Sequence, residues 1–307
     1  MEDKVLQIIL YFDIFSYPLK KEEIISFTRC SHNDEIIVQA LNSLEKQGII
    51  EVKEGYCYVG DPAKVERRKQ GNIMARKRMK SAIFFSRIIS WFPYVKGVML
   101  SGSISKGYMG EKDDIDYFIV TQPGRLWTVR TFLTLFKKLF LLNSYRNFCI
   151  NFFVDTDNMS IKERTRYAAT EIVFLLPVFK SSMYNKMLID NSWVKQYYPE
   201  FEQAHTKCME SEIWIKKWIE KILLNKTGDK LEDYLFKKSA SYIRRKFSNL
   251  DAQSFGKSFT LKRNELRYFP EHMQIQVAAI YLTKCKEYEE RFGITISGNQ
   301  LINHAMQ

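Results

Sequence analysis

Two acidic residues lie one position apart at the start of an apolar run, in the stretch LSGSISKGYMGEKDDIDYFIV. Asp114 and Asp116 flank Ile115, so a strand would carry both carboxylates on one face, about two residue rises apart. Two carboxylates beside an apolar core are costly unless a cation neutralises them. Hard divalent ions such as Mg2+ or Mn2+ take oxygen ligands and keep positions open for phosphate oxygens. The pair therefore predicts a metal site that acts on phosphates, where two ions can clamp the attacking and leaving oxygens of a displacement.

A Gly-Ser pair precedes these carboxylates, with ten residues between Ser103 and Asp114. Gly102 would let the backbone approach a triphosphate closely, and Ser103 adds a hydroxyl donor. A helix starting just after Ser103 would aim its free N–H groups at the anion. Lys106 is either a contact to a β- or γ-phosphate or an exposed lysine, and Asp113, out of phase with the pair, is expected in a turn. The stretch as a whole predicts a nucleotide-binding turn followed by a metal-binding strand.

At these residues the chain resembles the DNA polymerase β-type nucleotidyltransferase superfamily. The signature of that superfamily is Gly-Ser, a spacer of about this length, and Asp-x-Asp on a strand, and the match covers about residues 98–120. The resemblance implies that Asp114 and Asp116 bind the catalytic metals and that Gly102 and Ser103 hold the phosphates of the nucleotide.

The same resemblance implies a fold and a reaction. The fold would be of the α+β class: a polymerase-β-like nucleotidyltransferase palm over residues 63–160, with an N-terminal winged helix and a C-terminal helical domain. The reaction would move a nucleoside monophosphate from an NTP such as ATP to an acceptor hydroxyl, with release of pyrophosphate. The acceptor stays open between a small molecule, a protein and a nucleic acid.

The superfamily usually supplies a third carboxylate from a neighbouring strand, as a metal ligand or general base. In NFCINFFVDTD, alternation puts Asn151, Phe153 and Asp155 on one face, so Asp155 is the candidate third ligand. Asn151 is placed more centrally and could fill the position instead, although an amide cannot serve as a base. The alternative for Asp155 is a turn at the end of the strand.

Further polar and aromatic residues are open to two interpretations. Arg125 and Arg130 either face phosphate or lie at the surface, and Trp127 either stacks on a base or belongs to the core. Tyr167 and Glu171 are one helical turn apart and are candidates for contacts to the acceptor.

Residues 1–62 read as three helices followed by a hairpin that turns at Glu54-Gly55, which resembles a winged helix-turn-helix unit. This unit would bind DNA or act as a protein-contact module. The third helix offers mostly acidic and amide side chains to solvent, so DNA binding is possible but not favoured.

The next segment, residues 63–92, reads as one long helix whose first part is dense in Arg and Lys. Its basic residues form either a solvated face or a basic rim beside a phosphate site. They are Arg67, Arg68, Lys69, Arg76, Lys77, Arg78 and Lys80.

The remainder, residues 161–307, reads as mainly helical, with a loop-like stretch NLDAQSFGKSFTLKRNELRYF between two amphipathic helices. The first of these helices, EIWIKKWIEKILL, gathers its Trp and Ile residues largely along one face.

Composition supports these expectations only broadly. The 307 residues carry a net charge of +12, which favours polyanionic partners such as nucleotides. Five scattered cysteines favour reduced thiols over a disulfide framework. No apolar run approaches the roughly 20 residues that span a bilayer, so a cytoplasmic location without membrane association is expected. Besides a nucleotidyltransferase, the sequence allows a catalytically weak or inactive nucleotide-sensing, DNA-binding winged-helix regulator, or a structural module.

Overall fold

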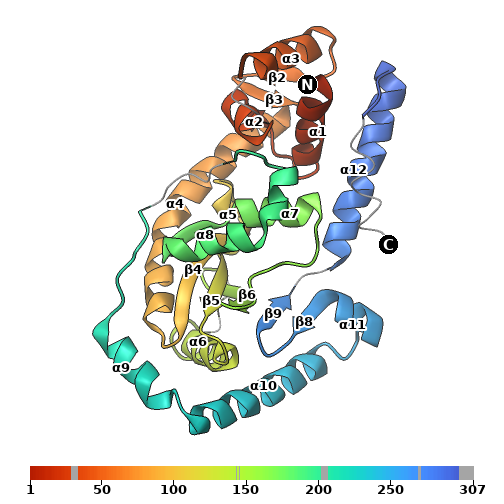
Figure 1. The fold of residues 1–307 in the computed structure, drawn as a ribbon. Helices are drawn as coiled ribbons and strands as arrows, with labels where there is room; N and C mark the ends of the chain where they lie inside the picture. Colours follow the sequence, from red (N-terminus) through yellow and green to blue (C-terminus); the bar gives the residue numbers. More distant parts are fainter. Residues whose placement is uncertain (29–33, 143, 145, 202–206, 269–270, 297–307) are drawn as a thin grey trace.

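The N-terminal unit contains three helices and a small sheet in a computed structural model that describes residues 1–28, 34–142, 144, 146–201, 207–268 and 271–296 (Figure 1). The order along the chain is α1 (Glu2–Asp13), β1 (Leu19–Lys20), α2 (Lys21–Thr28), α3 (Asp34–Lys46), β2 (Glu51–Lys53) and β3 (Tyr56–Tyr58). The strands lie in the order β1-β3-β2, all antiparallel. The three helices and the hairpin expected over residues 1–62 are thus present, with a short extra strand before α2.

Helix α4 (Ala63–Trp91) leaves this unit and runs along a six-stranded sheet. The strands are β4 (Val95–Ser101), β5 (Asp116–Thr121), β6 (Cys149–Asp155), β7 (Leu176–Phe179), β8 (Phe259–Leu261) and β9 (Glu265–Tyr268). Their order is β7-β4-β5-β6-β9-β8, with only the β5–β6 pair parallel among the described ladders. The class is α+β.

The two faces of the sheet bury different partners because the strands alternate. Tyr117 and Ile119 of β5 join one core with residues of α4 and α6 (Leu126–Phe140). Phe118 and Val120 join the other core with α1, α7 (Arg166–Val173), α8 (Ser181–Asp190) and the 3-10 helix η1 (Ser192–Gln196). The N-terminal unit therefore shares a continuous core with the α7 face of the sheet.

The segment after residue 160 is not separate from the sheet. It supplies β7, β8 and β9, and the stretch expected to be loop-like forms α11 (Ala252–Ser258) and the β8–β9 hairpin. The sequence-based reading failed here because these strands are only three or four residues long, too short for a periodicity signal. The final helix α12 (Glu271–Phe292) returns to α1, where Lys284 pairs with Asp13. No helix in the described part of the chain is long and apolar enough to cross a membrane.

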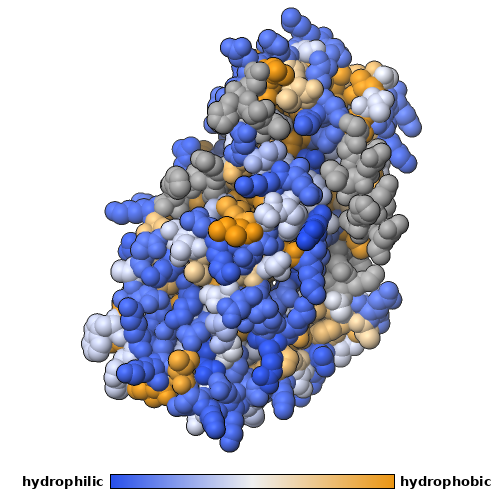
Figure 2. All heavy atoms as spheres, viewed as in Figure 1, coloured by the Kyte–Doolittle hydropathy of each residue, from blue (hydrophilic) through white to orange (hydrophobic). Residues whose placement is uncertain are grey.

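Helix α9 (Trp214–Leu223) packs in an unusual orientation, followed by α10 (Lys226–Lys246). Lys216 and Glu220 of α9 are buried, whereas Trp214 and Trp218 are 75% and 64% exposed. In Figure 2 a hydrophobic patch lies at the lower left, where Figure 1 places α9. The face of α9 directed to the sheet is thus its charged one.

Candidate active site

The two carboxylates lie together at the start of β5, although not both on the strand. β5 begins at Asp116, opposite Ser101 of β4, and Asp114 lies in the loop before it. The side chain of Asp116 faces α7, because Phe118, two residues further, packs into the core on that side. The expectation that a single strand carries both residues is therefore corrected: the loop supplies one and the strand the other.

Gly102 is in direct contact with this carboxylate. Its φ is +68°, a backbone conformation that residues other than glycine rarely adopt. A Cβ atom at Gly102 would lie only 2.6 Å from Oδ2 of Asp116. Two independent constraints thus require glycine here, and they place the Gly-Ser turn against the acidic strand. The helix that follows, α5 (Gly102–Ser105), is a single turn, so it is too short to act through a helix dipole.

Ser103 and Asp113 close the loop between α5 and β5. The Ser103 hydroxyl donates to Oδ2 of Asp113 at 2.9 Å, and the backbone N–H of Gly110 donates to the same oxygen at 2.8 Å. Asp113 is thus the turn residue that the sequence predicts. Because the Ser103 hydroxyl already donates to a carboxylate, a hydroxyl contact from Ser103 to a phosphate requires this bond to exchange.

Lys106 connects the Gly-Ser turn to α7. Its Nζ lies 2.9 Å from Oε1 of Glu171 and donates to the carbonyl oxygen of Gly102 at 3.1 Å. Its side chain is only 15% exposed, so the alternative of a freely exposed lysine is excluded. The residues at the site are therefore Asp114, Asp116 and Glu171, with Lys106 acting on Asp116 and Arg78 on Asp114 as cations.

Burial and neighbouring negative charges both raise the pKa of Asp116. Burial is the main cause that raises its pKa to about 6, and the neighbouring carboxylates of Asp114 and Glu171 add to the rise. A hydrogen bond from Cys149 and the charge of Lys106 oppose it only in part. The pKa of the Tyr167 hydroxyl is also raised, by burial first and then by Glu171 and Asp116. The site holds more negative charge than its own residues neutralise.

Asp155 does not complete the site, and the prediction that it is the third ligand is corrected. In the parallel β5–β6 ladder Asp116 is opposite Cys149, whereas Asp155 is opposite Thr121, at the far end of β5. Five residues of strand separate the two ends, roughly 16 Å. Asp155 is buried and accepts hydrogen bonds from the Asp157 backbone and the Asn158 side chain, so it makes a turn at the end of the strand.

The strand position beside Asp116 belongs to Cys149. The register of β6 shifts between Ile150 and Phe152, so Asn151 is the extra residue of a bulge. The side chain of Asn151 lies outside the described part of the structure. A third carboxylate comes instead from α7, as Glu171, which the sequence had suggested only as an acceptor contact. Nothing in the local sequence around Asp116 signals this long-range approach.

Asp114 and Asp116 supply only some of the ligands that a hard cation needs. Asp114 and Asp116 offer carboxylate oxygens, the ligand type that a hard divalent ion prefers, although the charges of Arg78 and Lys106 offset theirs in part. Within the described residues, no three His, Cys, Asp or Glu side chains are arranged as a ready metal-ligand group. Two carboxylates fit the ion, and its further ligands would be phosphate oxygens and water.

The residues considered for base stacking lie elsewhere and are structural. Trp127 is fully buried and donates its indole N–H to the carbonyl oxygen of Lys262. Arg125 is buried, pairs with Asp229, and lies over the ring of Tyr94. Arg130 lies over the ring of Trp127. Arg125 is the N-cap residue of α6, and Trp127 and Arg130 lie in its first two turns, after the end of β5 that is remote from Asp116.

The third helix of the N-terminal unit, α3, has no basic face. Its exposed side chains include Glu35, Gln39, Asn42, Glu45 and Lys46. Two carboxylates and one ammonium group give it no net attraction for phosphate.

No protein-family model matches the sequence, and neither the curated proteins nor the solved structures contain a match.

Proposed function

We propose that the chain is a metal-dependent nucleotidyltransferase with a polymerase-β-like palm, which moves a nucleoside monophosphate from an NTP to an acceptor hydroxyl. One observation carries the proposal: a glycine with positive φ lies directly against the Asp116 carboxylate, next to a second carboxylate and a lysine. The contact unites a backbone suited to phosphates with an acidic group suited to Mg2+ or Mn2+. The acceptor is a small molecule, a protein or a nucleic acid.

Each residue has a defined task in this proposal. Asp114 and Asp116 hold the divalent ion, which when bound neutralises phosphate charge during the displacement. Gly102, which has no side chain, lets the Asp116 carboxylate lie directly against the turn, and the backbone N–H of Ser103 would donate to a phosphate oxygen. Lys106, released from Glu171, balances charge on the departing pyrophosphate.

In this proposal Glu171 of α7 accepts the proton of the acceptor hydroxyl. The acceptor hydroxyl must lose a proton as it attacks, and Glu171 is a carboxylate that the ion does not need and that lies close enough to act on Asp116. In the free protein Glu171 is held by Lys106. Movement of Lys106 toward the phosphates would release Glu171 as the base, so that binding of the nucleotide and activation of the acceptor are coupled.

The proposal is tested by pyrophosphate release from each of the four NTPs with Mg2+, in the presence of a mixture of candidate acceptors. Asp116→Asn is expected to lower turnover about a thousand-fold, which corresponds to about 4 kcal/mol of transition-state stabilisation. The exposed Asp157→Asn is the matched control. Equal turnover in Asp116→Asn and Asp157→Asn would contradict the assignment.

A second function, a nucleotide-sensing winged-helix regulator with little or no catalysis, is favoured by Cys149. A thiol lies where a strand-borne third carboxylate would be expected, and it donates to Asp116. In this alternative an NTP still binds with Mg2+ but is not consumed. Binding measured together with turnover separates the two functions.

A further inference from the structure

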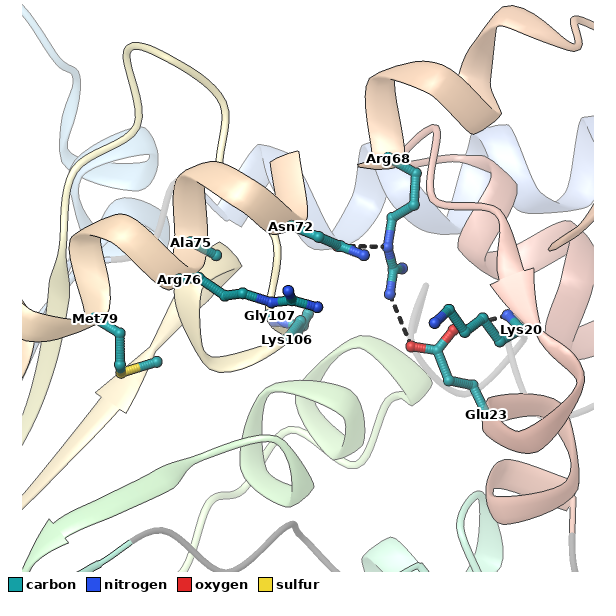
Figure 3. A pocket seen from close by; sticks show the side chains of 9 residues that line it. All are labelled: Lys20, Glu23, Arg68, Asn72, Ala75, Arg76, Met79, Lys106 and Gly107. Atoms are coloured by element: carbon teal, nitrogen blue, oxygen red, sulfur yellow. Dashed lines mark hydrogen bonds and ion pairs between the residues drawn. The ribbon is translucent and has the colours of Figure 1, made fainter. Parts of the chain in front are cut away.

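A pocket of about 340 Å³ lies between the winged-helix unit, α4 and the loop after α5 (Figure 3). Its charged lining residues are Lys20, Glu23, Arg68, Arg76 and Lys106, four cations to one carboxylate. This volume is at the small end of the range for ligand sites, about 300–1,000 Å³. The pocket is therefore large enough for a small anion and strongly biased towards negative charge.

The basic residues of α4 divide into two groups in the structure. Arg67, Arg68 and Lys69 each pair with a carboxylate, and Arg78 is buried against backbone carbonyl oxygens. Arg76 has no carboxylate partner among the described residues, and it lines the pocket. The sequence left open whether this helix is a solvated basic face or a basic rim beside a phosphate site. Of the cations of α4, Arg68 and Arg76 line the pocket, and of these two Arg76 is the one without a carboxylate partner among the described residues.

The basic side chains that line the pocket come from separate segments of the chain and point into the same pocket. Figure 3 shows Lys20, from the end of β1, and Arg76, from α4, reaching toward the pocket from opposite sides, with Arg68 between them. Glu23 is occupied, since it accepts from Arg68 at 2.8 Å and from the backbone N–H of Lys20 at 2.8 Å. Lys20 and Arg76 thus keep their charges without a carboxylate in the described structure.

The walls of the pocket are held rigidly. The Arg68 guanidinium lies 3.3 Å from the centre of the Tyr17 ring and donates from Nε to Asn72 at 2.9 Å. The Tyr17 hydroxyl donates to the carbonyl oxygen of Lys106 at 2.6 Å. The winged-helix unit is thereby bonded directly to the loop that follows the Gly-Ser turn. A ligand in the pocket would contact both.

We propose that this pocket binds a phosphate-bearing small molecule through Lys20 and Arg76, at a site distinct from the Asp114–Asp116 pair. Two cations from different segments suit the several oxygens of one phosphate group. The ligand would fasten the winged-helix unit to the loop that carries Lys106, and so act on the residue that contacts both Gly102 and Glu171. The proposal does not depend on nucleotidyl transfer, because no metal is needed to hold this anion.

Calorimetric titration in EDTA tests the proposal, with inorganic phosphate, pyrophosphate and AMP as probes. Binding is expected to wild type and to Asp114→Asn/Asp116→Asn, and to weaken at least tenfold in Lys20→Gln/Arg76→Gln. The control Lys77→Gln/Arg87→Gln removes the same charge from exposed positions of α4 outside the pocket and is expected to bind as wild type does.

The order of affinities identifies the source of the phosphate. Tighter binding of AMP than of inorganic phosphate supports an organic phosphomonoester, and the reverse order supports a free inorganic anion. The proposal is overturned if none of the three probes binds wild type, or if both charge-removing pairs weaken binding equally. A failure of nucleotide turnover leaves these outcomes unchanged, so the two proposals are judged separately.

Discussion

Each end of strand β4 lies beside a cluster of charged side chains. The two clusters differ in their balance of positive and negative charge. Near Val95, Lys216 donates to the carbonyl oxygens of Ser90 and Val95 and pairs with Glu212. Glu220 accepts from the backbone N–H of Tyr94 at 2.6 Å and pairs with Lys96. Two cations meet two carboxylates, and each buried group has partners.

At the other end, after Ser101, the balance is negative. Asp114, Asp116 and Glu171 are three carboxylates against two cations, Lys106 and Arg78. The pKa of Asp116 is raised to about 6, first by burial and then by the other two carboxylates. A balanced buried cluster holds α9 on the sheet, whereas an unbalanced one is a cost to the fold unless a ligand offsets it. The difference supports a structural role for the first cluster and, in the function proposed above, cation binding at the second.

The largest effect on stability is expected at the balanced cluster. Lys216→Met leaves Glu212 and two carbonyl oxygens without their buried partner, so the free energy of unfolding should fall by about 3 kcal/mol. Urea denaturation measures this loss, and the exposed neighbour Lys217→Met should stay within about 0.5 kcal/mol of wild type. The comparison fails if both variants are equally stable.

At the unbalanced cluster, removing a charge is expected to stabilise the protein without metal. The folded state binds the Asp116 proton more tightly than the unfolded chain, so stability is lost as pH rises from about 4 through 6. Asp116→Asn should match wild type near pH 4 and exceed it by up to about 3 kcal/mol at pH 8.

Chemical denaturation in EDTA across this pH range provides the measurement. The exposed Asp157→Asn should follow wild type at every pH. A difference between Asp116→Asn and wild type that does not change with pH would show that Asp116 is not an uncompensated charge.

A smaller effect on turnover is expected at Glu171, which the structure brings to the site, and none at Asp155, which it does not. Glu171→Gln should lower nucleotidyl transfer about a hundred-fold, the low end for loss of a general base. Asp155→Asn should leave turnover unchanged and cost about 1 kcal/mol of stability, since it weakens only a turn. The reverse pattern in steady-state kinetics would place Asp155 at the reaction centre.

The predictable part of the site is the part that is local in sequence. Gly102, Asp114 and Asp116 lie within one loop and strand, so residue type and spacing suffice to bring them together. Glu171 arrives from α7, which is far from Asp116 along the chain, and no local spacing encodes that approach.

The errors have physical causes in particular strands and helices. Alternation along β6 misplaces Asp155, because a bulge at Asn151 changes the phase and because the parallel direction puts the end of β6 beside the end of β5. In α9 the hydrophobic pattern identifies a helix but not its orientation. Lys216 and Glu220 face inward because the ends of α4 and β4 offer them carbonyl, N–H and lysine partners, and these arise only from the tertiary fold.

The most decisive measurement is the affinity of the protein for Mn2+. Electron paramagnetic resonance detects the binding, with a non-hydrolysable ATP analogue present. Wild type and Asp155→Asn are expected to bind Mn2+ with the same affinity, and Asp114→Asn/Asp116→Asn at least tenfold more weakly. Equal affinity in all three proteins would contradict the assignment of Asp114 and Asp116 as the metal site.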